Sequence, residues 1–327
     1  MLSTDPDQPT APPPERIAAI DIGSNSIRLV VAQVDPSGGY RVIDEERENT
    51  RLAGEIDATG RLGDEAVEAS FVALRNFLHI AAGYQVKQLR AIATSAVRDA
   101  ANGRAFCDRA AEELGLAIEV ISAEQEGRLA YLSVARAFDV TELPIAVADI
   151  GGGSTEIVLA SGGLIDEVFA TRLGAVRVAE RCGLIAETDA HGLQAAEAFV
   201  DRQLRRCVGK APLVPSRLYG AGGTFTAMAS AMMARAGEAE APLRGYQTTR
   251  AKVRHLMTDL AGMPLEKRRR VAGLNPRRAD IIVAGLLVID RVMRRLKVNL
   301  VQVHTGGVRD GLLLTMIEES LTAGRTL

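Results

Sequence analysis

The chain has 327 residues, of which 47% are hydrophobic and 24% charged, and its formal net charge is -2. This composition is that of a globular protein long enough for two domains of roughly 150 residues each, and it gives no general attraction to nucleic acid or membrane. The longest strongly apolar run, Ile281 to Ile289, is about half of what spans a bilayer. With no signal-peptide pattern and three widely spaced cysteines, we expect a cytoplasmic protein without disulfides or a zinc site.

Helix and strand patterns alternate along the first half of the chain, as in α/β proteins. Residues 1–15 are polar and proline-rich and predict a disordered tail. Ser122 and Gln125 have the spacing of a helix capping box, which places Glu126 one turn into a helix. The other predicted elements are strands at 17–20, 27–34, 87–93 and up to 121, and helices at 64–80, 103–115 and 123–138.

The opening pattern returns 128 residues later. Asp21-Ile22-Gly23-Ser24-Asn25-Ser26 and Asp149-Ile150-Gly151-Gly152-Gly153-Ser154-Thr155 each follow a strand pattern and precede another. Such a repeat predicts duplicated α/β lobes with a cleft between them. We assign residues 16–130 and the C-terminal helix 308–325 to lobe I, and residues 131–307 to lobe II. Two later strands, at 217–219 and 300–303, run into the turns Gly220-Ala221-Gly222-Gly223-Thr224 and His304-Thr305-Gly306-Gly307.

The two aspartate loops predict a phosphate clamp. Gly and Ser leave backbone N–H groups free to converge on an anion, and hairpin geometry alone requires no acid at the start of a turn. Asp21 would either order a metal-bound water or hydrogen-bond its own loop. The predicted phosphate-binding residues are Asp21, Gly23, Ser24, Asn25, Ser26, Gly151, Gly152, Gly153, Ser154, Thr155, Gly222, Gly223 and Thr224.

Several competing motifs are missing from the sequence. It has no GxxxxGK[ST], GxSxG, HExxH or CxxC, and neither aspartate loop reads GxGxxG. Hydrolysis by an activated water is then the simplest chemistry, and it requires charge neutralisation, a positioned water and a base. Asp149 and Glu156 bracket the second loop and could hold Mg²⁺ through oxygen, while Glu126 could orient the water.

Taken together, these motifs resemble the exopolyphosphatase and guanosine pentaphosphate phosphohydrolase family, in its short two-domain form. The resemblance covers roughly Arg16 to Ile317 and implies a duplicated actin-like ATPase (ribonuclease H-like) fold. Besides the two aspartate loops, the matching segments are Ala93-Thr94-Ser95-Ala96-Val97-Arg98-Asp99-Ala100, Ile121-Ser122-Ala123-Glu124-Gln125-Glu126-Gly127-Arg128, Asn275-Pro276-Arg277-Arg278-Ala279-Asp280 and Gly307-Val308-Arg309-Asp310-Gly311.

The resemblance also implies roles for individual residues. Glu126 matches the catalytic base, and Asp149 and Glu156 match the acids that hold a divalent cation such as Mg²⁺. Arg98 matches an arginine of the phosphate site. Arg28 and Arg278 match positions linked to binding the anionic ligand. The implied substrates are inorganic polyphosphate and guanosine penta- or tetraphosphate; because the chain ends soon after its last motif, we expect shorter anions. Many members carry two consecutive glutamates where this chain has Gln125-Glu126, so we expect no second carboxylate beside the base.

Some alternatives stay open at this stage. Lys and Arg outnumber Asp and Glu between Arg244 and Lys297 and could steer a polyanion, although Arg268-Arg269-Arg270 is more typical of a solvated helix face. The chain has no Trp and five Tyr, so a nucleic-acid partner is not predicted. His304, beside a glycine turn, is the one histidine that could belong to the site. A non-hydrolytic alarmone or nucleotide regulator, a sugar or acetate kinase, and a homodimer are not excluded.

Overall fold

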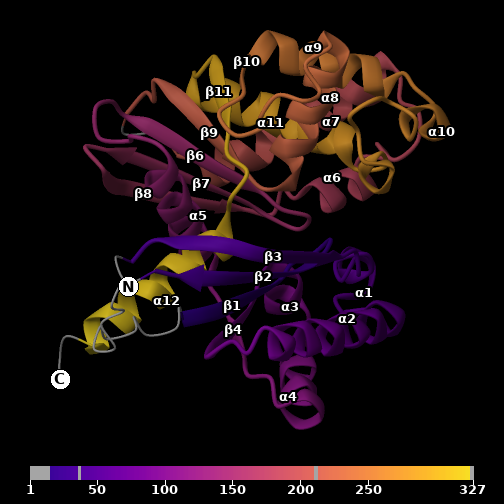
Figure 1. Cartoon of the computed structure of the whole chain (residues 1–327). Helices are drawn as coiled ribbons and strands as arrows, with labels where there is room; N and C mark the ends of the chain where they lie inside the picture. Colours follow the sequence, from indigo (N-terminus) through magenta and orange to yellow (C-terminus); the bar gives the residue numbers. More distant parts are fainter. Residues whose placement is uncertain (1–14, 36–37, 210–212, 325–327) are drawn as a thin grey trace, which may run out of the picture.

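The computed structural model describes residues 15–35, 38–209 and 213–324. Two β-sheets with their helices lie one above the other and form two lobes, and α5 (Ala123–Ala137) runs between them (Figure 1). Except for Glu15, the tail predicted for residues 1–15 lies outside the described residues. No helix in the described part of the chain is long and apolar enough to cross a membrane.

The first sheet has five strands in the order β3-β2-β1-β4-β5. Strands β1, β2 and β3 form an antiparallel meander, and β4 and β5 continue in parallel with β1. One face packs against α2 and α4 through Phe71, Phe77 and Phe106, and the other against α12 through Leu313 and Met316. The elements are β1 (Glu15–Ile22), β2 (Ile27–Val34), β3 (Tyr40–Glu48), α1 (Ile56–Thr59), α2 (Asp64–Gly83), β4 (Gln88–Ala93), α3 (Ser95–Asp99), α4 (Gly103–Leu114), β5 (Ile118–Val120) and α12 (Val308–Gly324).

The second sheet has six strands in the order β10-β11-β9-β6-β7-β8. One face packs against helices that include α11, where the longest apolar run of the sequence lies buried in the core. The elements are β6 (Ile145–Ile150), β7 (Thr155–Ser161), β8 (Leu164–Thr171), α6 (Ala175–Arg181), α7 (Ala190–Cys207), β9 (Arg217–Ala221), α8 (Gly223–Ala236), β10 (Gln247–Thr249), α9 (Arg250–Ala261), α10 (Leu265–Arg268), the 3-10 helix η1 (Pro276–Arg278), α11 (Ile282–Leu296) and β11 (Leu300–Val303).

Helix α5 contacts both sheets. Ala130 belongs to the core between α12 and the first sheet, whereas Tyr131 and Val134 pack against the second sheet. The predicted capping box is confirmed: the Ser122 hydroxyl accepts from the Gln125 N–H at 3.1 Å, and the Gln125 side chain accepts from the Ser122 N–H at 2.8 Å. The domain boundary placed at residue 130 falls within this helix, so the division of the chain into domains stays a prediction.

The edge strands β3 and β8 were not predicted. The sequence of β3 is Tyr-Arg-Val-Ile-Asp-Glu-Glu-Arg-Glu, and most of its side chains are exposed or half-buried. Strand β8 also has mostly exposed or half-buried positions. An edge strand with so little buried surface lacks the apolar signal by which a strand is recognised in sequence.

Candidate active site

The two aspartate loops are hairpins of identical register. Asp21 lies opposite Arg28 between β1 and β2, and Asp149 lies opposite Glu156 between β6 and β7. Each turn is closed by the same backbone hydrogen bond, from Gly23 N to Ser26 O at 3.2 Å and from Gly151 N to Ser154 O at 3.0 Å. The sequence repeat is thus also a structural repeat. The position opposite the aspartate differs, because it is Arg28 in one lobe and Glu156 in the other.

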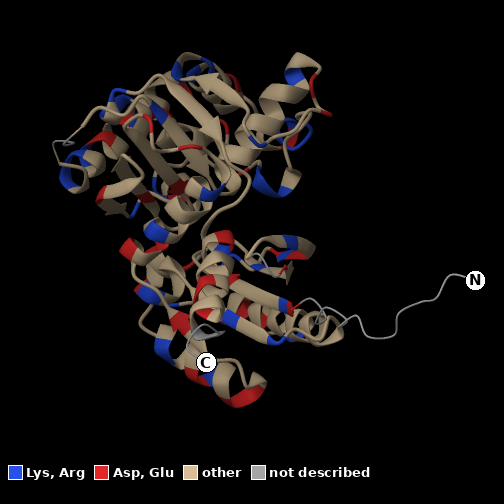
Figure 2. Ribbon diagram, turned by 60° about the vertical axis from the view of Figure 1, so that its left-hand side comes forward, with Lys and Arg blue, Asp and Glu red and all other residues tan. Residues whose placement is uncertain are grey.

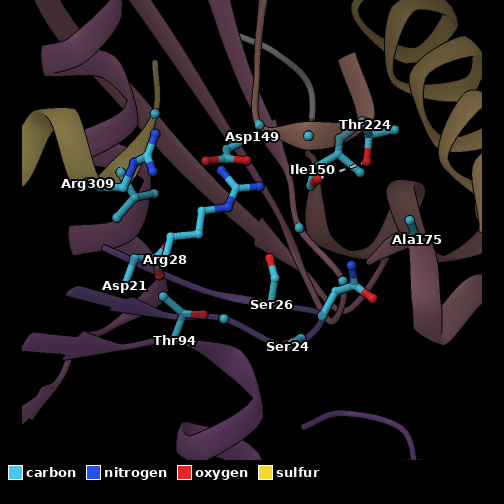
Figure 3. A pocket seen from close by; sticks show the side chains of 18 of the residues that line it. Asp21, Ser24, Ser26, Arg28, Thr94, Asp149, Ile150, Ala175, Thr224 and Arg309 are labelled. Atoms are coloured by element: carbon cyan, nitrogen blue, oxygen red, sulfur yellow. Dashed lines mark hydrogen bonds between the residues drawn. The ribbon is translucent and has the colours of Figure 1, made fainter. Parts of the chain in front are cut away.

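Both hairpins open into one cavity of about 80 Å³ between the sheets, which we call the inner cavity (Figure 3). This volume is sufficient for several water-sized groups. The Arg28 side chain extends across it from the Asp21 side toward Asp149. The predicted site residues that line it are Asp21, Gly23, Ser24, Asn25, Ser26, Arg28, Glu126, Asp149, Gly151, Gly152, Gly222, Gly223, Thr224 and Arg278.

Glycine at position 222 lets the turn after β9 approach Asp149, the aspartate of the second loop. Its φ of +88° is a conformation that side chains disfavour, and a Cβ added there would lie 2.4 Å from the Asp149 Oδ1. The backbone therefore comes against this carboxylate only because position 222 has no side chain.

Five predicted residues lie outside the inner cavity: Arg98, Gly153, Ser154, Thr155 and Glu156. The Thr155 hydroxyl donates to the Leu173 carbonyl at 2.7 Å, and the Gly153 carbonyl accepts from Arg177 at 3.2 Å. Gly153 also lets the hairpins meet, because a Cβ there would come within 2.6 Å of the Ser24 hydroxyl oxygen. Gly153 and Thr155 therefore hold the second loop in place from outside the inner cavity.

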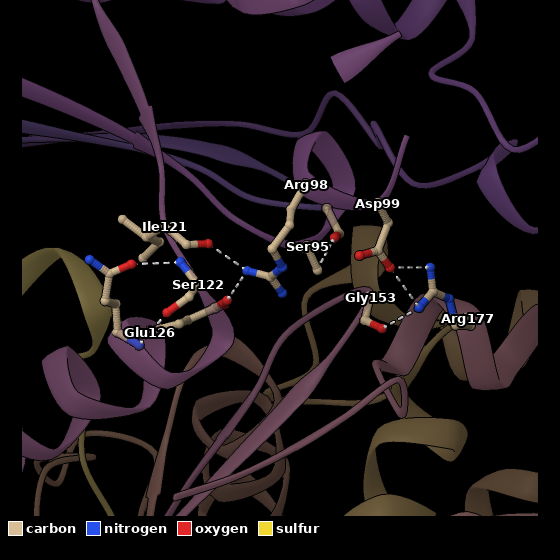
Figure 4. A network of polar contacts seen from close by, with 10 residues as sticks. Ser95, Arg98, Asp99, Ile121, Ser122, Glu126, Gly153 and Arg177 are labelled. Atoms are coloured by element: carbon tan, nitrogen blue, oxygen red, sulfur yellow. Dashed lines mark hydrogen bonds and ion pairs between the residues drawn. The ribbon is translucent and has the colours of Figure 1, made fainter. Parts of the chain in front are cut away.

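Glu126 lies in the first turn of α5 and is only 6% exposed. Its Oε2 accepts from Arg98 Nη1 at 3.2 Å, and the same nitrogen donates to the Ile121 carbonyl at 2.9 Å (Figure 4). Burial raises the pKa of Glu126 to about 8; Arg98 counteracts this, and the negative charges of Asp149 and Asp21 add to it.

The sequence predicted no second carboxylate beside Glu126, because Gln125 precedes it where many family members have a glutamate. This prediction is wrong. The Gln125 side chain turns back to cap α5, and the carboxylates that raise the pKa of Glu126 come from the two hairpins instead. Burial similarly raises the pKa of Asp149 to about 6, with Arg28 acting in the opposite direction and Asp21 adding to the increase.

The proposed cation ligands differ in position. Asp149 lines the inner cavity, whereas Glu156 is 1% exposed, lies outside its lining and has no hydrogen-bond partner at either carboxylate oxygen among the described residues. Asp21 lines the cavity too, and its buried Oδ1 likewise lacks a partner. Nowhere in the described ranges do three or more His, Cys, Asp or Glu side chains gather in a way that could hold a metal ion. Because Mg²⁺ is commonly held by one or two carboxylates together with substrate phosphates and water, Asp149 and Asp21 fit it as a partial set of ligands.

The turn after β11 was not predicted to be part of the site. Thr305, Gly306, Gly307, Arg309 and Asp310 line the inner cavity, as do Thr94 and Ser95 after β4. Gly307-Val308-Arg309-Asp310-Gly311 was among the family-like motifs, but no role followed from it. The turn after β11 was visible in the sequence; its position against the two hairpins depends on the parallel pairing of β11 with β9 and of β9 with β6.

His304 does not line the inner cavity. It is 5% exposed, and its Nε2 lies 2.7 Å from the Ser133 hydroxyl on α5. Burial lowers its pKa to about 4, so the ring stays neutral at physiological pH. The histidine that the sequence offered as a candidate site residue therefore links the strand end of β11 to α5.

Much of the basic segment between Arg244 and Lys297 is structural. Arg268 is completely buried and donates to six backbone carbonyls, which corrects the expectation of a solvated helix face there. Arg291 is also buried, with its Nη1 2.8 Å from Glu197. Basic and acidic positions are interspersed over both lobes (Figure 2). Of the basic residues in this segment, Arg278 alone lines the inner cavity.

Ion pairs join the lobes beside the cavity. Arg177 on α6 is 7% exposed and pairs with Asp57 at 2.9 Å. It also pairs with Asp99 at 3.4 Å (Figure 4). Arg51 pairs with Asp280 at 2.7 Å. These contacts link the two lobes beside the two hairpins.

Comparison with known proteins agrees with this geometry. The model of the Ppx/GppA phosphatase family matches residues 30–320. The chain belongs to the Ppx/GppA phosphatase family. It is 29% identical over 314 residues to exopolyphosphatase 2 of Mycobacterium tuberculosis, which covers 92% of this chain and 98% of that protein.

Solved structures of this family share the fold. The Ppx/GppA family member of Aquifex aeolicus is 30% identical, with a TM-score of 0.78 over 94% of this chain and 99% of that one. An exopolyphosphatase of Cytophaga hutchinsonii has a TM-score of 0.87 at 24% identity, over 93% and 98% of the two chains, and shows the fold alone. The predicted α/β fold with duplicated actin-like ATPase lobes is confirmed.

Proposed function

We propose that this Ppx/GppA protein removes terminal phosphate from inorganic polyphosphate, from guanosine pentaphosphate, or from both, by Mg²⁺-dependent hydrolysis. The observation that carries the proposal is the convergence of Glu126, the two aspartate hairpins and Arg28 on one cavity. Family membership supports phosphate release, and the name of the Mycobacterium tuberculosis relative supports polyphosphate as a substrate.

In this proposal the terminal phosphoryl group binds between the hairpins. Backbone N–H groups of the two loops donate to its oxygens, and the guanidinium groups of Arg28 and Arg278 compensate its charge. Arg278 is 8% exposed and makes no side-chain hydrogen bond or ion pair with the described residues. A buried cation that forms no ion pair with the described residues is well suited to accept an anionic ligand.

Glu126 is the proposed general base. It takes a proton from the water that attacks phosphorus, while the bond from phosphorus to the leaving phosphate oxygen breaks. Its raised pKa increases its basicity, and the hydrogen bond from Arg98 fixes its orientation. Arg98 is thus a positioning residue for the base.

Asp149 and Asp21 are the proposed carboxylates for Mg²⁺, and Glu156 acts behind Asp149 as its cross-strand neighbour. When bound, the ion supplies charge neutralisation at the transferred phosphoryl group. We further propose a preference for short chains, which the comparison of tripolyphosphate with long-chain polyphosphate tests.

The proposal is tested by phosphate release from tripolyphosphate, long-chain polyphosphate, guanosine pentaphosphate and ATP, with Mg²⁺ and with a chelator. We expect release from at least one of the first three, and its loss on chelation. Tight binding of guanosine tetraphosphate without phosphate release from any of them would replace this proposal with the non-hydrolytic regulator. Acceleration of ATP consumption by an alcohol or a carboxylate would indicate a kinase.

A further inference from the structure

Two arginines lie directly opposite each other at the edge of the first sheet. Arg28 on β2 is the cross-strand partner of Arg47 on β3, and both are half-buried. Side chains at such paired positions point to the same face of a sheet, and like charges placed opposite each other destabilise the pairing. The fold therefore keeps a repulsive pair where two neutral residues would be more stable.

Neither arginine forms an ion pair with a described residue, although the negative charges of Asp21, Asp149 and Glu45 act on Arg28 from farther away. Arg28 has no hydrogen bond or ion pair to a described side chain, and no carboxylate of that part of the chain lies within ion-pair distance of Arg47. Arg47 donates to Asn49 at 3.1 Å, but its buried Nε lacks a partner. Arg309 differs, because Glu45 accepts from its Nη2 at 2.8 Å. Burial, together with Arg28 and the other nearby arginines, lowers the pKa of Arg47 to about 10.

A second, outer cavity of about 210 Å³ lies at this arginine pair. Arg28 and Arg309 line both cavities, so the outer cavity continues the inner one. Arg47 lines only the outer cavity, and Glu126 lines only the inner one. The remaining lining of the outer cavity is Glu45, Glu46, Gly222, Gly223, Thr226 and Thr305. The outer cavity thus lies away from the proposed base.

We infer that Arg47, together with Arg28, forms a second anion subsite that binds the phosphoryl groups following the one being hydrolysed. This inference rests on the proposed function and deepens it. The ligand class is a chain of linked phosphoryl groups, which polyphosphate and guanosine pentaphosphate share. Bound phosphoryl oxygens would accept the unused guanidinium N–H groups and remove the repulsion between the two arginines.

The test uses Arg47→Gln, which keeps the aliphatic stem and removes the charge. We expect KM for long-chain polyphosphate to rise about tenfold, as for loss of a charge-assisted hydrogen bond, with kcat unchanged. The rise should become smaller as the chain is shortened to tripolyphosphate. A rise for polyphosphate or for guanosine pentaphosphate supports the subsite, and its pattern identifies which chain is bound.

Arg41→Gln is the matched control, because Arg41 is an exposed arginine of the same strand and lies opposite Gln33. It should change KM by less than about twofold, as expected for an exposed charge. Without substrate, Arg47→Gln should raise the thermal midpoint, because it relieves repulsion. The subsite would be overturned by an equal KM factor for all polyphosphate lengths, by an unchanged KM for both polyphosphate and guanosine pentaphosphate, or by a lowered thermal midpoint.

Failure of the subsite can be distinguished from failure of the proposed function. If the wild type releases no phosphate, the proposed function fails. The subsite is then measured by calorimetric binding of long-chain polyphosphate to the wild type and to Arg47→Gln. Equal affinity of the two proteins would overturn it, and weaker binding by Arg47→Gln would sustain it.

Discussion

The hydrogen bond from Arg98 to Glu126 should set the pH range in which this enzyme works. Arg98 lowers the raised pKa of Glu126 through its charge and through the 3.2 Å contact. Arg98→Met keeps most of the side-chain volume and removes both effects. A hydrogen bond to a charged group contributes about 1.5–3 kcal/mol, which corresponds to about one to two pKa units. The pKa of Glu126 should therefore rise further in the variant.

The sign of the kinetic effect follows from the role of Glu126. A general base acts only when it is deprotonated, so activity decreases as the pH falls below its pKa. The acidic limb of kcat/KM should move by about one to two pH units toward alkaline pH in Arg98→Met, and kcat should recover at high pH. A bound cation shifts the limb in both proteins, so the difference between them is the readout.

The assay is phosphate release from tripolyphosphate across the pH range, with Arg128→Met as the control. Arg128 lies in α5, the helix of Glu126, and pairs with the exposed Glu124 at 2.9 Å. Its loss should therefore leave the acidic limb of kcat/KM in place. An unshifted limb in Arg98→Met, or a shift toward acid, would refute the reasoning. Loss of activity that high pH does not restore would show that Arg98 binds phosphate itself.

Three further predictions concern the surroundings of the base. Burial and the charge of Glu126 raise the pKa of Glu156 well above its ordinary value of 4.5, so the stability contributed by its neutral form is lost as the pH rises above that ordinary value. In thermal melts without Mg²⁺, the midpoint of the wild type should therefore fall with rising pH relative to that of Glu156→Gln, and parallel curves would contradict this. In Gly223→Ala the new Cβ would lie 1.9 Å from Arg278 Nη2, so we expect the guanidinium to move and KM to rise about tenfold, as for loss of a charge-assisted contact, with the fold intact by circular dichroism; an unchanged KM would remove Arg278 from the anion site. Arg177→Ala removes the ion pairs to Asp57 and Asp99 and should lower the unfolding free energy by roughly 2 kcal/mol and raise KM, as measured by denaturant titration and kinetics; unaltered values would show that these pairs do not hold the lobes.

The sequence predicted those parts of the site that depend on local patterns. The aspartate hairpins, the capping box before Glu126 and the repeat over 128 residues each require only neighbouring residues or two copies of one motif. Because both hairpins have the same register, the prediction that the two loops lie on either side of a cleft identified most of the residues that line the inner cavity.

The remaining features depend on contacts between distant segments. Arg268 is surrounded by carbonyls from several loops, so a run of three arginines gave no sign that one of them is buried. The carboxylates that raise the pKa of Glu126 come from across the cleft, whereas the adjacent position in sequence holds the capping Gln125. Arg47 lies on an edge strand with too few buried residues to be predicted, so its pairing with Arg28 could not be seen.

The central claim is that Glu126 activates the water that hydrolyses a phosphoanhydride bond. It is tested most directly by measuring phosphate release and substrate affinity on the same preparations of Glu126→Gln and Glu124→Gln, where Glu124 is the exposed glutamate of the same helical turn. We predict that release falls by about a hundredfold or more only in Glu126→Gln, as for removal of a general base, while both variants bind the substrate like the wild type. Undiminished phosphate release by a folded Glu126→Gln protein would contradict the account.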